Sequence, residues 1–305
     1  MTQLPTLRQL EYVVALADHG TFVEAARRCG VSQPALSKQV REVEELLGVD
    51  LFERARPAAL LTPAGVEVVA RAREVLSSAR DLADAAAAAS GRAPANVRLG
   101  VIPSVAPYGL PGLISKVRAR YPRVTIVVHE LQTVELLAAL RVGAVDVGLL
   151  AHPFDGGGLH GADVAFERFV FAAPAGHPLA TEGPIEVAAL AGVVLLLMED
   201  GHCLRDQALE VCAAAGSPRN VDVTAASVTT LTRLVEGGLG ATLLPESAVP
   251  VEVRLDAGIV TRTFVAPSPG RTLTLQWRAR SPHEPWLREL AGLLRDHYVP
   301  LLDAV

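Results

Sequence analysis

Residues 20–41 read GTFVEAARRCGVSQPALSKQVR, a pattern typical of two short helices joined by a tight turn. Ser32 is a good N-cap for the second helix, and Pro34 falls early in that helix, where its missing N–H costs nothing. One face of the helix is apolar, with Leu36, Val40 and Val43. The segment therefore predicts a helix-turn-helix.

The same segment is locally basic in an acidic chain. Between Ala25 and Arg41 there are four basic residues and no acidic one, whereas the whole chain has a net charge of −5. A helix-turn-helix presents its second helix to the major groove of double-stranded DNA. The candidate DNA contacts are Ser32, Gln33, Pro34, Ala35, Ser37, Lys38 and Arg41. The alternative is a solvated polar face on an ordinary helical bundle.

Thr62-Pro63 begins a further helix, which we expect to run over residues 63–90. Its apolar residues are spaced alternately by three and four, as in a coiled-coil seam: Val69, Ala72, Leu76, Ala79, Ala83 and Ala86. We interpret it as a dimerising linker helix. The alternative is a surface helix on a globular domain.

From Val97 onward, short apolar runs alternate with amphipathic helical segments such as 110–120 and 133–142. The expected strands are 97–102, 124–128, 145–151, 169–173, 193–197, 241–244 and 273–277. Repeated βα units predict an α/β fold with parallel sheets covered by helices. We expect a regulatory domain over 91–305 in two lobes, the second over about 166–267, with ligands bound at the carboxyl ends of the strands or between the lobes.

Length and composition are consistent with this organisation. With 305 residues, 50% of them apolar, the chain is long enough for two or three domains. Its longest uncharged apolar run, Val187 to Met198, has twelve residues, too few to span a bilayer. No export signal is evident, so we expect a cytoplasmic protein with no membrane partner, in which the three cysteines are thiols.

Cys203 and Cys212 are nine residues apart, with no helix breaker between them. In a continuous helix their sulfurs would lie on opposite faces, about 13 Å apart along the axis. A disulfide requires Cα atoms within roughly 7 Å, so these two can pair only if the segment unwinds. The alternative is two small buried apolar residues. The spacing is not a metal-binding motif, and we expect neither a metal nor a cofactor.

The neighbours of Cys203 favour reactivity. His202 precedes it and Arg205 follows, in what we expect to be the first turn of a helix. A helix N-terminus and nearby cations lower the pKa of a thiol toward the thiolate that attacks oxidants. Cys212 has only apolar and acidic neighbours, which suits a resolving thiol.

The first sixty-odd residues closely resemble the N-terminal domain of LysR-type transcriptional regulators. The likeness rests on the motifs Leu7-Arg8-Gln9-Leu10, Ala25-Ala26, Val31–Ser37, Leu51-Phe52-Glu53-Arg54 and Leu61-Thr62-Pro63-Ala64-Gly65. It implies a winged helix-turn-helix over 1–62 with Arg54 and Arg56 as DNA contacts in the wing, a linker helix that pairs two chains, and a two-lobed effector domain. The wing has fewer basic residues than is usual, and Cys29 takes a core position.

Much of the remaining chain resembles the hydrogen-peroxide sensors of that family. The motifs are Met198–Gln207 with Cys212, Leu99–Ser104, Pro107-Tyr108, His129-Glu130, Gln132-Thr133, Leu243-Leu244-Pro245 and Trp277-Arg278. The resemblance implies a peroxidatic Cys203, a resolving Cys212 and a peroxide pocket made by Ser104, Thr133, His202, Arg205, Asp206 and Arg278. It also implies a homotetramer built as a dimer of dimers, contact with RNA polymerase, and a thiol reductant.

Two other functions remain open at this point. A LysR-type regulator could instead respond to a small metabolite between its lobes, with incidental cysteines. A thiol peroxidase is disfavoured, because the chain has no C-x-x-C reductase motif and has a DNA-reading half. We therefore expect a regulator and not an enzyme.

Overall fold

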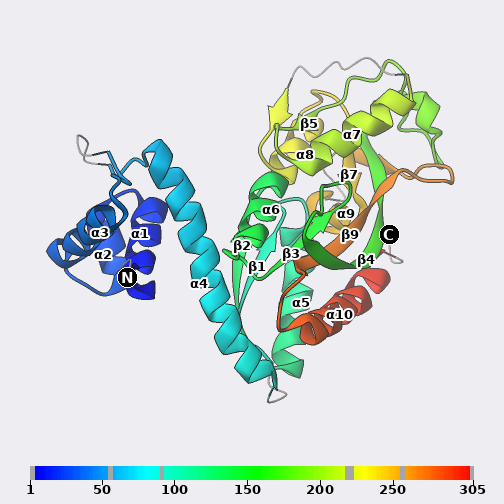
Figure 1. Cartoon of the computed structure of the whole chain (residues 1–305). Helices are drawn as coiled ribbons and strands as arrows, with labels where there is room; N and C mark the ends of the chain where they lie inside the picture. The colour runs from blue at the N-terminus through cyan, green and yellow to red at the C-terminus, as the bar shows by residue number, and fades with distance from the viewer. Residues whose placement is uncertain (1–3, 54–57, 90–92, 217–222, 255–257, 303–305) are drawn as a thin grey trace. The chain divides into compact units, whose positions relative to one another are not determined.

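The computed structural model describes residues 4–53, 58–89, 93–216, 223–254 and 258–302. The chain forms two units, one of residues 1–92 with 142–144 and one of residues 93–141 with 145–305. Figure 1 labels their helices and strands. No described helix is long and apolar enough to cross a membrane.

The first unit begins with three short helices: α1 (Leu7–His19), α2 (Phe22–Cys29) and α3 (Gln33–Leu47). Gly20 and Gly30 end α1 and α2 in the left-handed conformation that glycine adopts without strain. Ser32 caps α3 by accepting the N–H of Ala35, and Pro34 lies in the first turn. The predicted helix-turn-helix is confirmed, with the expected apolar face of α3 in the core.

The helix α4 (Pro63–Ala89) follows an antiparallel bridge between Phe52 and Leu61. Part of the predicted seam on α4 is occupied within the unit itself. Val69 belongs to the core of the helix-turn-helix, while Ala72 and Leu76 pack with Leu10 of α1. Its dimerising role stays a prediction.

The second unit is built on a seven-stranded sheet in the order β2-β1-β3-β9-β4-β7, with β8 also paired to β4. Its strands are β1 (Asn96–Val101), β2 (Thr125–Glu130), β3 (Val147–Ala151), β4 (Leu159–Pro174), β7 (Thr242–Pro245), β8 (Ile259–Arg262) and β9 (Gly270–Arg278). A separate pair comprises β5 (Leu197–Met198) and β6 (Thr224–Ala225).

This sheet corrects the expectation of purely parallel sheets. The pairs β1·β2 and β1·β3 are parallel, but β9 runs antiparallel to both β3 and β4. The difference arises because β4 is long and serves two lobes: its residues 159–168 pair with β9, and residues 169–174 pair with β7 and β8. The strand expected at 193–197 contributes only its last residue to β5, while β6 and β8 were not predicted.

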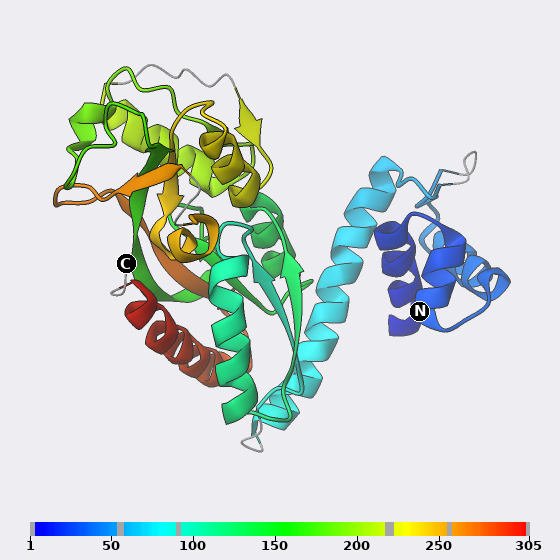
Figure 2. The same ribbon diagram turned by 180° about the vertical axis from the view of Figure 1, so that it is seen from behind.

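Two hydrophobic cores define the lobes. The first lobe surrounds β1, β2, β3 and β9 with α5 (Ala106–Arg120), α6 (Thr133–Arg141) and α10 (Glu284–Leu302). The second lobe surrounds the end of β4 with α7 (Cys203–Ala214), α8 (Val228–Glu236), α9 (Val249–Glu252) and the short 3₁₀ segments η1 (Val187–Leu190) and η2 (Glu246–Ala248). Figure 2 shows α5 and α10 lying side by side.

Candidate functional site

Ser104 and Thr133 lie just beyond the carboxyl ends of neighbouring parallel strands. Ser104 follows β1, and Thr133 opens α6 after β2. Since parallel strands end at the same edge of a sheet, both residues stand where α/β folds bind ligands. Both are buried.

Cys203 is the first residue of α7, with His202 as the N-cap, and both are buried. Although α7 belongs to the second lobe, Cys203 packs in the core of the first lobe, which also contains Leu273 of β9. The sulfur therefore lies at the boundary of the two lobes. The helix N-terminus provides partial positive charge there, as the sequence predicts.

An arginine that the sequence analysis missed lies at this boundary. Arg271, near the start of β9, is fully buried, and its Nη1 donates to Ser104 Oγ at 2.7 Å and its Nη2 to the Ser104 carbonyl at 3.0 Å. Burial alone would lower the pKa of Arg271, but attraction to Glu167 and to the Cys203 sulfur outweighs it, so that pKa is raised. Arg271 thus bonds Ser104 directly and interacts with the Cys203 sulfur through its charge.

The expected site residue Arg278 is placed elsewhere. It ends β9, where Leu159 is its partner, and its Nη1 donates to the carbonyls of Leu140 and Val145 at 3.4 and 3.1 Å. Because β9 is antiparallel to β3, Arg278 lies toward the amino ends of the parallel strands and Arg271 beyond their carboxyl ends. Arg278 therefore lies at the opposite end of β9 from Ser104, and the arginine beside Ser104 is Arg271.

Two further expected residues do not converge on Ser104. The Nη1 of Arg205 donates to the Met198 carbonyl at 3.0 Å and its Nε pairs with Asp200 at 2.8 Å, so this side chain closes the turn before α7. Asp206 is exposed. Arg205 still adds positive charge within the first turn of the helix.

Gln132, which precedes Thr133, lies beside His202. The Nε2 atoms of His202 and Gln132 are 3.4 Å apart. Gln207, one turn after Cys203, donates to the His152 carbonyl at 2.8 Å. Among the described residues, Thr133 Oγ1 and Gln207 Oε1 are buried oxygens with no hydrogen-bond partner. Such atoms suit a small polar ligand. Gln207 was missed, although its spacing of four from Cys203 places it on the same helix face.

Cys212 lies at the other end of α7, in the core of the second lobe. Cys203 and Cys212 are both free thiols. They lie in one continuous helix, as the sequence predicts. Burial raises the pKa of the Cys212 thiol. This protonated, buried sulfur is suited to a second step and not to the first attack.

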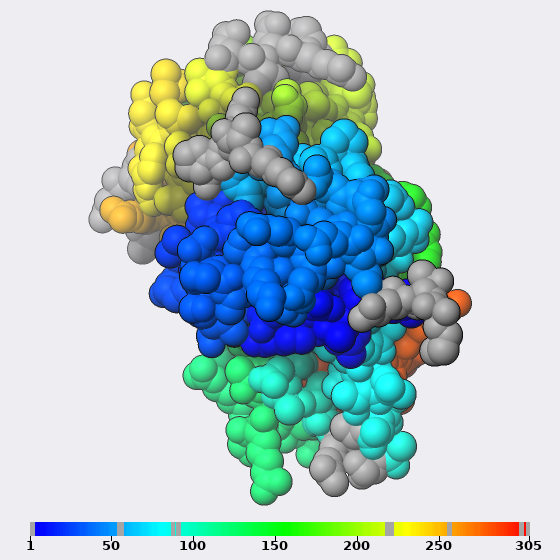
Figure 3. All heavy atoms as spheres, turned by 60° about the vertical axis from the view of Figure 1, so that its left-hand side comes forward, coloured from blue at the N-terminus to red at the C-terminus, as the bar shows by residue number. Residues whose placement is uncertain are grey.

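The candidate DNA contacts lie at the N-cap of α3 and along the first nine residues of that helix, 33–41. Ser32, Gln33, Pro34, Ala35, Lys38 and Arg41 are exposed, and Ser37 is half-buried. Lys38 has a weak ion pair with Glu42 at 3.7 Å, which leaves its side chain 76% exposed. Figure 3 turns the surface of this unit, in blue, toward the viewer. Arg54 and Arg56 lie outside the described residues.

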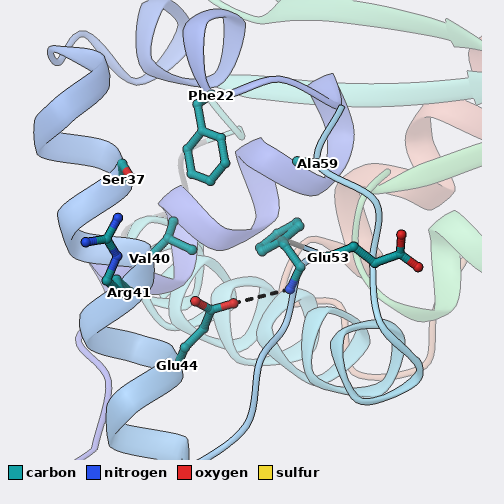
Figure 4. Close-up of a pocket in the computed structure, with 8 residues that line it drawn as sticks. Phe22, Ser37, Val40, Arg41, Glu44, Glu53 and Ala59 are labelled. Atoms are coloured by element: carbon teal, nitrogen blue, oxygen red, sulfur yellow. Dashed lines mark hydrogen bonds between the residues drawn. The ribbon is translucent and has the colours of Figure 1, made fainter. Parts of the chain in front are cut away.

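A groove runs between α3 and the start of the wing. Arg41, Glu44 and Phe52 are among the residues that line it (Figure 4). The Glu44 Oε1 atom accepts the backbone N–H groups of Leu51 at 2.8 Å and Phe52 at 3.2 Å. This carboxylate holds Leu51 and Phe52 against α3, the helix on which the candidate DNA contacts lie.

Comparisons with known proteins agree along the chain. Residues 7–66 match the bacterial regulatory helix-turn-helix proteins of the lysR family, and residues 90–299 match the LysR substrate binding domain. The chain is 43% identical over 295 residues to a "Probable hydrogen peroxide-inducible genes activator" of Mycobacterium avium, covering 96% of this chain and 94% of that protein. It is 39% identical over 289 residues to the "DNA-binding transcriptional dual regulator OxyR" of Escherichia coli, covering 95% and 94%.

Solved structures give the same result. A full-length OxyR variant from Pseudomonas aeruginosa is similar with a TM-score of 0.79 and 35% identity, covering 95% of this chain and 94% of that one. A hydrogen-peroxide-bound cysteine mutant of Corynebacterium glutamicum OxyR has a TM-score of 0.69 and 33% identity, covering 99% and 95%. This chain belongs to the LysR family of bacterial helix-turn-helix regulators.

Proposed function

We propose that this chain is a DNA-binding transcriptional regulator that senses hydrogen peroxide through Cys203. The observation that carries the proposal is the position of Cys203: it is the first residue of α7 and is buried at the lobe boundary. The charge of Arg271, the arginine bonded to Ser104, is attracted to the Cys203 sulfur. The relatives named as peroxide-inducible activators support it.

The first step is a two-electron transfer from sulfur to peroxide. The Cys203 thiolate attacks one oxygen of HO–OH, an S–O bond forms, the O–O bond breaks, and hydroxide leaves. The hydroxide takes up the proton that the thiol released on ionisation and becomes water. Sulfur is oxidised to sulfenic acid and the peroxide is reduced. Arg271 and the hydroxyls of Ser104 and Thr133 orient the peroxide and stabilise the charge that develops on the departing oxygen.

The second step uses Cys212. Its thiol condenses with the Cys203 sulfenic acid, forming the S–S bond and releasing water. Nine residues at about 1.5 Å per residue separate the two sulfurs by about 13 Å along α7, so the helix must open before they meet. A thiol reductant restores the pair.

The DNA-reading half follows from α3. Lys38 and Arg41 supply exposed positive charge for phosphates or base edges, and Gln33 an exposed amide for base edges. We infer that α4 pairs two chains, that a dimer of dimers binds the promoter in the cytoplasm, and that opening of α7 alters the packing of effector domains and the contact with RNA polymerase. Arg54 and Arg56 stay predicted wing contacts.

Counting thiols tests this function. The denatured chain has three cysteines, and one equivalent of hydrogen peroxide added to the native protein should leave one titratable thiol. Cys203→Ser should retain its two remaining thiols and its DNA affinity, but its DNA footprint should no longer change with peroxide. A wild-type protein that keeps all its thiols while a metabolite alters its footprint would establish the metabolite-responsive alternative instead.

A further inference from the structure

A buried carboxylate stands behind Arg271. Glu167, on β4, and Arg271, on β9, both have fully buried side chains, and Arg271 Nε donates to Glu167 Oε2 at 2.7 Å. Ser247 of η2 donates its backbone N–H to Glu167 Oε1 at 3.3 Å and its hydroxyl to the same oxygen. Glu167 is therefore held by the second lobe on one side and holds Arg271 on the other.

The guanidinium of Arg271 is held on two sides, by Glu167 and by Ser104. Its Nε–H is directed at Glu167, and one N–H from each terminal nitrogen is directed at Ser104. A guanidinium has five N–H donors in a rigid plane. Of these, three are used in the described contacts, and the two others lie on the terminal nitrogens, the part of the group nearest Ser104.

We propose that Glu167 is a positioning residue for the peroxide reaction, holding the Arg271 guanidinium in the plane that directs its terminal N–H groups toward the oxygens of the substrate. The proposal rests on the proposed function. Glu167 does not touch Cys203 in any described contact and acts through Arg271. A donor that is rotated away from the developing oxyanion loses most of its effect on the rate, because that effect depends on preorganised geometry.

The chain offers a matched control one residue along the same strand. Arg168 Nε donates to Glu246 Oε2 at 2.9 Å, and the Glu246 side chain is 1% exposed. Like Glu167, Glu246 is a buried carboxylate paired with an arginine at the junction of β4 and η2. Arg168, the partner of Glu246, is half-exposed and has no described contact with Ser104. Glu246→Gln thus reproduces the loss of a buried charge at a carboxylate that has no described contact with Arg271.

The test measures two rate constants for Cys203 at one pH, with hydrogen peroxide and with iodoacetamide, in full-length protein carrying Cys29→Ser and Cys212→Ala. Both reactions require the thiolate, so their ratio cancels the thiolate fraction, but only peroxide requires aligned hydrogen-bond donors. In Glu167→Gln the ratio of peroxide to iodoacetamide rates should fall at least tenfold. In Glu246→Gln it should stay within twofold of the parent.

An unchanged ratio in folded Glu167→Gln overturns the proposal. Should that variant fail to fold, Ser247→Ala decides, because it removes one hydrogen bond from the carboxylate and retains the ion pair; its ratio should fall at least threefold, and an unchanged ratio overturns the proposal. A parent protein whose Cys203 does not react with peroxide would refute the proposed function itself, which separates the two failures.

Discussion

Exchanging Arg271 for lysine should slow the reaction of Cys203 with peroxide. The same exchange at Arg278 should have no effect on that reaction. The two arginines lie seven residues apart on β9, which at about 3.3 Å per residue is about 23 Å. No single small pocket spans that distance. Lysine retains the charge near Cys203 but loses the planar fork that bonds Ser104 and Glu167 together.

The magnitude follows from the donors that are lost. Removing one donor to a developing oxyanion slows a reaction about 100- to 1,000-fold, so Arg271→Lys should slow peroxide reduction by about 100-fold. Alkylation of Cys203 by iodoacetamide should change less than about threefold, since the positive charge stays. Arg278→Lys alters contacts in the first lobe that include the carbonyls of Leu140 and Val145, and both of its rates should match wild type.

Stopped-flow measurement of peroxide consumption in Cys212→Ala protein provides the assay, with thermal melting to establish that each variant is folded. Truncation of Arg271 to alanine is less informative, because it leaves Glu167 as an unpaired buried charge at a cost of about 3–5 kcal/mol. A slow Arg278→Lys beside a normal Arg271→Lys would refute the assignment of the site arginine drawn from the strand register.

Three other outcomes are expected. Cys212→Ala should react with peroxide at the wild-type rate and accumulate sulfenic acid, which dimedone labelling detects. In oxidised wild-type protein, hydrogen exchange across α7 should rise, and a disulfide formed with unchanged exchange would contradict opening of the helix. Lys38→Ala should weaken promoter binding and flatten its salt dependence, by a slope of about one if the contact is to phosphate, while Lys116→Ala in the other unit should do neither. Tyr108→Phe should lower the free energy of unfolding by about 1–3 kcal/mol, measured by urea titration, since it removes the hydroxyl that donates to buried Glu252 at 2.9 Å.

The parts of the molecule that the sequence predicted well are those determined by local interactions. The helix-turn-helix depends on caps and glycines within a few residues of each helix end, as Ser32 and Gly30 illustrate. The position of Cys203 at the start of α7 is also local, since the helix N-terminus and Arg205 are its neighbours in the chain. Local patterns of this kind can be read from one sequence.

Arg271 and Glu167, which sequence reasoning missed, depend on contacts between distant segments. Arg271 meets Ser104 across 167 positions, and Glu167 meets Arg271 across 104. Which end of β9 reaches the site follows from its antiparallel pairing with β3, and neither composition nor periodicity reveals strand direction. A short motif match therefore selected Arg278, which lies at the other end of β9 from Arg271.

The two cores suggest how oxidation at one sulfur would reach the whole effector unit. Among the described buried residues, each lobe contributes one side chain to the core of the other: Cys203 packs in the first lobe, and Tyr108 of α5 packs in the second. Disulfide formation would draw Cys203 toward Cys212, which lies in the second-lobe core, and so withdraw it from the first. Opening α7 would also release Leu204 and Ala208 from the second core. Close-packed protein interiors do not deform continuously, so the lobes would have to repack around the new bond. A two-electron oxidation at Cys203 would thereby change the shape of the effector unit.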